Sequence, residues 1–162
     1  MVRTIAMLVA PAALALGAVD PVMGAGPKAA PCQAAAPIMT GFPTPRPWRW
    51  LGECPGGRAG GLGVLRLGTD EGMTFFVGRM HAGRPVAGLL DKGATLMLAK
   101  AFTPAGVAIP PDGNHPGEAH AVFVLASQAA RATSRWFAAR GNRASANWYR
   151  EMAHDILDGE PE

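Results

Sequence analysis

The sequence predicts an α+β fold, in which short antiparallel β-hairpins precede a C-terminal antiparallel helical hairpin. Short apolar segments alternate with glycines over residues 48–91, and apolar residues recur at helical spacing over residues 117–157. The chain has 162 residues and is 49% hydrophobic, but only 7% of its residues are aromatic. We therefore expect one small domain with a modest core.

Residues 1–25 have the features of a signal peptide. Arg3 supplies a short positive region, and the apolar run over residues 4–19 contains no charge. This run is shorter than the roughly 20 apolar residues that span a bilayer. We predict an exported protein, periplasmic or extracellular. An uncleaved N-terminal membrane anchor is the alternative.

Residues 26–47 contain six prolines and no hydrophobic periodicity, so they predict a Pro-rich linker that is partly polyproline II. We interpret this linker as a spacer, although such a stretch can also be a ligand for another domain. The only two cysteines are Cys32 and Cys54. In an oxidising compartment they predict a disulfide worth about 3 kcal/mol, which would pin the linker to the domain. Two free thiols are the alternative.

Residues 48–102 predict the β-hairpins. Four segments of strand length lie at 48–51, 63–67, 74–77 and 86–90, and the glycines between them indicate turns or close backbone approach. Residues 94–102 fit a strand or a short helix, and we favour a strand. Prolines and an Asp-Gly pair then predict a loop over residues 103–116.

Residues 117–158 predict the helical hairpin. Gly141 suits the end of the first helix, and Asn142 suits the N-cap of the second. The apolar faces expected for the two helices are, in order, Val122, Leu125, Ala129, Ala132 and Trp136, then Ala144, Trp148, Met152 and Ile156. We expect few large side chains in the core, chiefly Trp48, Trp50, Phe75, Phe76, Phe123, Trp136 and Trp148.

An aromatic residue followed by spaced glycines occurs twice within the hairpin region. Glycines follow Trp50 at +2, +7, +11 and +13, and they follow Phe76 at +2 and +7, with Gly88 at +12. This spacing resembles the MORN (membrane occupation and recognition nexus) repeat, with two copies of which the second is degenerate. The resemblance covers about 45 residues and implies stacked hairpins. We interpret Trp50 and Phe76 as stacking core residues rather than as ligand contacts.

The sequence offers no catalytic motif. The histidines form no HExxH and pair with no nucleophile-elbow serine, the cysteines form no CxxC, and the Gly-rich run at 60–63 lacks the lysine of a phosphate loop. We therefore predict no enzyme activity, no cofactor and no metal; a small exported hydrolase is the alternative. A zinc pair of His115 and His120 is a weaker interpretation than two surface histidines.

The functional prediction is an exported protein-binding or scaffold module of the cell envelope. Its predicted binding residues on the second hairpin are Arg79, His81 and Arg84, and its partner is an unknown protein. The alternative is a peripheral membrane-surface protein that binds anionic lipid through these arginines and those of the helices. A solvated helical face would explain the helical arginines equally. A net charge of +3 is too small to indicate nucleic-acid binding.

Overall fold

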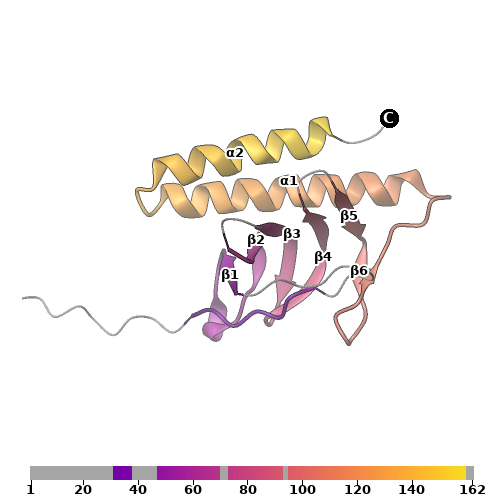
Figure 1. Cartoon of the computed structure of the whole chain (residues 1–162), viewed down its shortest axis with the longest axis horizontal. Coiled ribbons are helices and arrows are strands. Elements are labelled where there is room, and N and C mark those ends of the chain that lie inside the picture. Colours follow the sequence, from indigo (N-terminus) through magenta and orange to yellow (C-terminus); the bar gives the residue numbers. More distant parts are fainter. Residues whose placement is uncertain (1–30, 38–46, 70–72, 93–94, 160–162) are drawn as a thin grey trace, which may run out of the picture.

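The computed structural model describes residues 31–37, 47–69, 73–92 and 95–159, and within them it has the predicted α+β architecture (Figure 1). The predicted signal peptide and most of the predicted linker lie outside the described residues. A five-stranded antiparallel sheet carries the helical hairpin on one face. The N-terminal arm, residues 32–36, and a small two-stranded sheet lie against the other face.

The sheet is a meander whose spatial order, β1-β2-β3-β4-β5, follows the chain. Its strands are Trp48–Leu51, Gly61–Leu67, Thr74–His81, Arg84–Asp91 and Leu96–Ala99, and a 3-10 turn, Pro55–Gly57, separates β1 from β2. The strand expected within residues 94–102 is confirmed, as β5 together with β6, Ala101–Phe102. The loop predicted over residues 103–116 is partly wrong, because β7, Ala108–Ile109, pairs with β6. Gly106, at φ 85°, closes the turn between them.

Two antiparallel helices, α1 (Pro116–Ala138) and α2 (Arg143–Asp158), form the predicted hairpin. Gly141 takes a positive φ of 74° between them. The Asn142 side chain accepts a hydrogen bond of 3.0 Å from the backbone N–H of Ser145, which makes it the predicted N-cap. These local signals set the helix boundaries because the glycine and the asparagine act on the backbone groups of the adjoining helical turn.

The first core lies between the sheet and the helices. One residue from each of the four strands β1 to β4 packs against small and aromatic residues of α1 and α2; the strand residues are Leu51, Val64, Val77 and Leu89. The buried face of α1 is broader than predicted and comprises Val122, Phe123, Ala126, Ser127, Ala129, Ala130 and Thr133. Leu125 and Ala132 are only half-buried. The difference arises because α1 contacts both the sheet and α2, so it buries two stripes.

The predicted burial of Trp148 is wrong, since this side chain is 44% exposed. Ala144 is exposed as well, and α2 instead buries Ala146, Tyr149, Met152, Ala153 and Ile156. The reason is that α2 packs chiefly on α1 rather than on the sheet. Two hydroxyls of α1 fix the rotation of α2 about its axis. Ser127 donates a hydrogen bond of 2.8 Å to the carbonyl oxygen of Ala153, and Ser134 donates one of 2.7 Å to that of Ala146.

The second core lies on the opposite sheet face, beneath the N-terminal arm. The buried side chains of this face include Trp50, Leu65, Leu67, Phe76, Met80 and Leu90. The backbone of Gln33 bonds to Gly57 and Ala59, and the N–H of Ala35 donates to the carbonyl of Gly83 at 2.6 Å. Cys32 and Cys54 are joined in the predicted disulfide. The arm is therefore a packed part of the domain rather than a spacer.

The two aromatic residues of the predicted repeat occupy equivalent places over a row of glycines. Gly63, Gly78 and Gly88 lie opposite one another on β2, β3 and β4. The Trp50 ring covers Gly63, and the Phe76 ring covers Gly78 and Gly88. Both rings are buried, with 4% and 0% of their surface exposed, so neither is available to a ligand at the surface.

Candidate functional site

The β3–β4 hairpin brings the three predicted binding residues together on one side of its tip. Arg79 and His81 alternate with buried residues of β3, on the same face as Val77, and His81 lies directly opposite Arg84. Val77 packs against the helices, so all three side chains project from the helix-bearing face of the sheet. All three side chains are exposed.

The tip of this hairpin is held in place by its turn and by the arm. Ala82 and Gly83 take φ values of 48° and 82°, which suits a two-residue hairpin turn. Gly83 donates to the carbonyl of Ala59 at 2.8 Å and accepts from Ala35. A Cβ atom at Gly83 would lie 3.8 Å from that of Arg58, so a further exposed arginine adjoins the tip.

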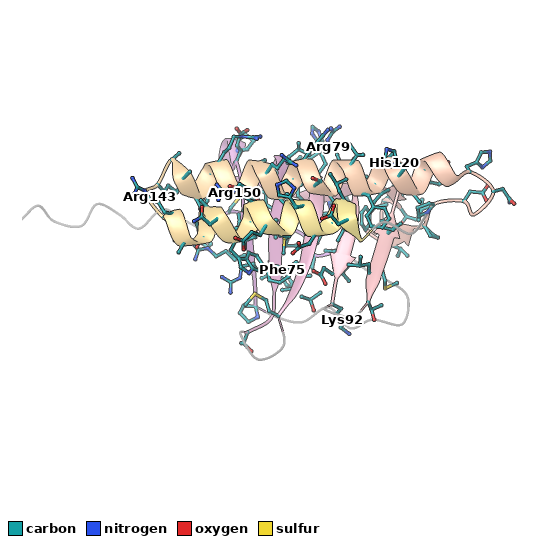
Figure 2. The ribbon with its side chains drawn as sticks, turned by 90° about the horizontal axis from the view of Figure 1, so that it is seen from above. Phe75, Arg79, Lys92, His120, Arg143 and Arg150 are labelled. Carbon is teal, nitrogen blue, oxygen red and sulfur yellow. A yellow bond between two sulfur atoms is a disulfide. The ribbon has the colours of Figure 1, made fainter. Side chains whose placement is uncertain are left out.

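Helix α1 adds two arginines to the same side of the molecule. Arg135 lines a hollow of about 410 Å³ together with Leu62 and Glu53, and Leu62 lies directly opposite Arg79 in the sheet. Arg131 is exposed one helical turn before Arg135. Viewed from above the helices, Arg79 emerges beside α1 and away from α2 (Figure 2). We call this surface the basic face; it consists of Arg79, His81, Arg84, Arg131 and Arg135.

Other arginines of the helical hairpin have partners within the helices. The Arg140 guanidinium lies 3.8 Å from the centre of the Trp136 ring and donates to the carbonyl of Trp136 at 3.0 Å. Arg150 donates to the side-chain oxygen of Asn147 at 3.0 Å. These two residues fit the solvated-face interpretation better than a role in binding.

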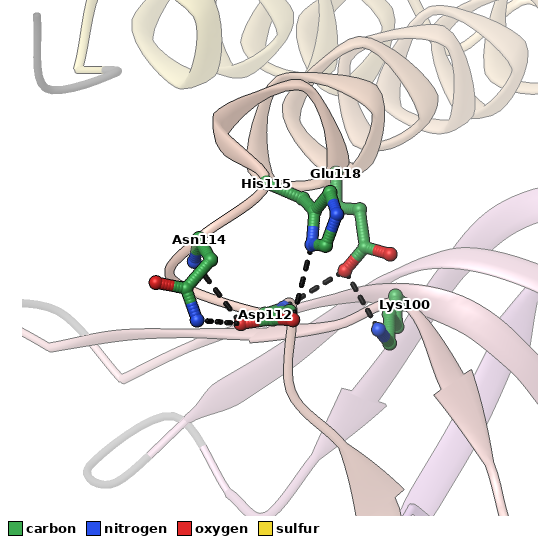
Figure 3. A network of polar contacts seen from close by, with 5 residues as sticks. All are labelled: Lys100, Asp112, Asn114, His115 and Glu118. Atoms are coloured by element: carbon green, nitrogen blue, oxygen red, sulfur yellow. Dashed lines mark hydrogen bonds and ion pairs between the residues drawn. The ribbon is translucent and has the colours of Figure 1, made fainter.

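A polar network anchors the loop that precedes α1 (Figure 3). Glu118 accepts from the Lys100 ammonium at 2.7 Å and from the backbone N–H of Asp112 at 2.8 Å. Asp112 in turn accepts from the backbone and the side chain of Asn114, and its carboxylate lies 3.0 Å from Nδ1 of His115. These bonds stabilise both carboxylates, so they hold the pKa of Asp112 and the pKa of Glu118 below their ordinary values.

The weaker zinc interpretation of His115 and His120 gains no support from this network. The ring of His115 contacts Asp112, and in the described ranges no group of three or more His, Cys, Asp or Glu side chains could hold a metal ion. Nor does either helix, the only long elements described, have the length and apolar character needed to cross a membrane.

No family model, curated protein or solved structure matches the chain. The MORN resemblance therefore stays a prediction, which rests on the spacing of Trp50, Phe76 and their glycines. The glycine row and its two covering rings are properties of this structure, whichever family the chain belongs to.

A second surface, which the sequence did not predict, lies on the α2 side of the helices. Phe75, Trp148 and Tyr149 gather there beside Arg66, with ring centroids 5.3 Å apart for Phe75 and Trp148, and 4.6 Å for Trp148 and Tyr149. A signal for it exists in the sequence. Trp148 is adjacent to Tyr149, and neighbouring residues on a helix point about 100° apart, so one of two adjacent aromatics can lie at the edge of the buried face.

Proposed function

We propose that this chain is an exported, non-enzymatic binding module of the cell envelope that holds an acidic protein partner on its basic face. The observation that carries the proposal is the juxtaposition of the β3–β4 tip with Arg131 and Arg135 of α1. A surface on which arginines outnumber carboxylates, as they do here in spite of Glu53 beside Arg135, attracts and orients a partner of negative charge. The partner therefore presents several carboxylates to this face.

Three features support an envelope scaffold in particular. The disulfide between Cys32 and Cys54 is typical of an oxidising compartment. The arm and the turn at Gly83 hold the tip rigidly, which lowers the entropy cost of binding. The MORN resemblance, with its two aromatic rings over a glycine row, agrees with a scaffolding role.

A capture experiment tests the proposal. The protein is immobilised and exposed to envelope extract, beside the variant Arg79→Glu/Arg84→Glu. The matched control is Arg143→Glu/Arg150→Glu, which makes the same charge change on α2 (Figure 2). We expect wild type and control to retain the same acidic protein, and the tip variant to lose it. Equal retention by all three proteins would contradict the proposal.

The alternative function is attachment to an anionic membrane surface, and the exposed arginines of the basic face favour it. Flotation with phosphatidylglycerol vesicles at low and high salt separates the two functions. If the tip variant alone loses vesicle binding, the membrane function replaces the protein-binding one. If wild type does not float at low salt, the membrane function is excluded.

A further inference from the structure

A groove lies on the side of the helical hairpin opposite the basic face. In the view from above, Phe75 emerges beside α2, whereas Arg79 emerges beside α1 (Figure 2). Trp148 and Leu96, which are 44% and 40% exposed, are among the most exposed large apolar side chains in the described part of the molecule. Both line this groove, so it leaves apolar surface in contact with water.

The first half of the groove is an aromatic hollow of about 240 Å³. Its walls are the rings of Phe75, Phe137, Trp148 and Tyr149, together with Met73 and Ser145, and Arg66 supplies its charge. Burial raises the pKa of the Tyr149 phenol, whereas the positive charges of Arg66 and Arg49 act to lower it. These two arginines are paired across β1 and β2. This end of the groove is therefore apolar with a cationic group, the Arg66 guanidinium, in its lining.

The second half is an acidic hollow of about 310 Å³. Its carboxylates are Asp91 at the end of β4 and Glu151 and Asp155 on α2, and Leu96, Met152 and Ile156 form its apolar floor. Trp148 lines both hollows and stands between them. The groove thus changes from positive to negative across a single exposed indole ring.

We propose that this groove binds an extended peptide segment that presents an acidic, an apolar and a basic side chain in turn. Each hollow is near or below the lower limit of pockets for drug-sized ligands, so each suits one side chain rather than a whole cofactor. Alternate residues of an extended chain point the same way, about 7 Å apart, and so can fill adjacent hollows. The basic side chain meets Glu151 and Asp155 and can stack on Trp148.

The mixed charge selects a peptide over other macromolecules. An anionic membrane or a nucleic acid would be repelled by the carboxylates of the acidic hollow. The site is independent of the basic face, since the two lie on opposite sides of the helical hairpin. A failure of one proposal therefore leaves the other standing.

Binding of short blocked peptides tests the inference. The probe is acetyl-Asp-Ala-Phe-Ala-Lys-amide, whose three functional side chains share one face when it is extended. Its controls replace Phe by Ala, Asp by Lys, or Lys by Asp. A simple reversal is not a control, because a peptide bound in the opposite direction restores the same charge order. Shifts of the Trp148 indole N–H in NMR spectra report binding, and Trp148→Phe assigns that signal.

We expect the probe to bind about tenfold more tightly than each control peptide. Glu151→Lys/Asp155→Lys changes only exposed side chains, and it should shift the preference to the peptide with two Asp residues. Trp148→Ala should weaken binding of the probe about fivefold or more. Because this variant lacks the indole, its binding is followed by the backbone N–H shifts of Glu151 and Asp155. Far-ultraviolet circular dichroism verifies that each variant is folded.

Three results would overturn the inference. The first is that the Phe-to-Ala peptide binds as well as the probe. The second is that the Glu151 and Asp155 reversal leaves the peptide preference unchanged. The third is that the protein is dimeric in light scattering and that Trp148→Ala makes it monomeric, because the groove would then belong to an interface between two copies of the chain.

Discussion

The indole ring of Trp50 lies directly against the backbone of Gly63, where a Cβ atom would come within 2.7 Å of ring atom Cζ2. The Phe76 ring has the same relationship with Gly78 and Gly88, at 3.0 and 2.9 Å. Both aromatic rings therefore need the absence of a side chain on the strand beneath them. This requirement explains why glycine, which is normally unfavourable in a strand, occupies the centres of β2, β3 and β4.

Replacing Gly63 with Ala should destabilise the domain by about 2 kcal/mol, because the new methyl group must displace Trp50 or the neighbouring backbone. Urea unfolding followed by circular dichroism measures the loss. Gly113→Ala is the matched control, since a Cβ atom there would meet nothing within 4 Å. Equal stability of the two variants would contradict this account of the glycine row.

Replacing Thr133 with Val should cost about 1 to 2 kcal/mol. The Thr133 hydroxyl is buried and donates a hydrogen bond of 3.0 Å to the carbonyl oxygen of Leu51, which joins α1 to β1. Valine has the same shape but no hydroxyl. Thr133→Ser keeps the donor and loses only a methyl group, so thermal unfolding of the two variants separates hydrogen bonding from packing. A stable Val variant would show that the bond contributes little.

Reduction of the disulfide should raise the intact mass by about 2 Da and lower the stability by about 3 kcal/mol. The N-terminal arm should loosen first, so the N–H groups of Gln33 and Ala35 should lose protection from hydrogen exchange. Cys32→Ser/Cys54→Ser should behave like the reduced protein. Unchanged protection of both amides would mean that the backbone bonds hold the arm without the disulfide.

The phenol of Tyr149 should titrate near pH 12. Burial raises the pKa of this group to about 12, in spite of the nearby positive charges of Arg66 and Arg49. The protein contains one tyrosine, so its ultraviolet absorbance follows this group alone, and Tyr149→Phe removes the signal. Because the folded pKa lies above the unfolded value of about 10, this contribution to stability is complete below pH 10 and declines as the pH rises toward 12. A midpoint near 10 would mean that α2 does not bury the ring.

The carboxyl groups of Asp112 and Glu118 should titrate below their ordinary pKa values of 3.8 and 4.5. Folding lowers both pKa values, so the stabilisation they provide is present above these values and is lost as the pH falls through the folded pKa. Carbon-detected NMR measures each titration. Lys100→Met should raise the pKa of Glu118, which loses an ion pair of 2.7 Å. An unchanged midpoint for Glu118 in this variant would remove the ion pair as a cause.

Local signals in the sequence predicted the elements well but predicted the candidate surfaces only in part. The residues of the β3–β4 tip could be predicted because they lie close together in the sequence. A β-hairpin there places His81 opposite Arg84, with Arg79 two residues before His81 on the same face. The membrane-surface alternative already joined the helical arginines to them. Which of those arginines lie on the same side, Arg131 and Arg135, could not be predicted, since that depends on where α1 crosses the sheet. The aromatic groove was missed because spacing within α2 placed Trp148, rather than Tyr149, in the core.

The sequence by itself determined the order and type of the elements other than β7, the ends of the helices at Gly141 and Asn142, and the pairing available to Cys32 and Cys54. Each of these depends on backbone preferences or on the number of cysteines. Only the tertiary structure decided that α1 lies between the sheet and α2, and that the arm covers the second face of the sheet. Periodicity shows that a helix has an apolar face but not which neighbour it meets, so the exposure of Trp148 follows from packing alone.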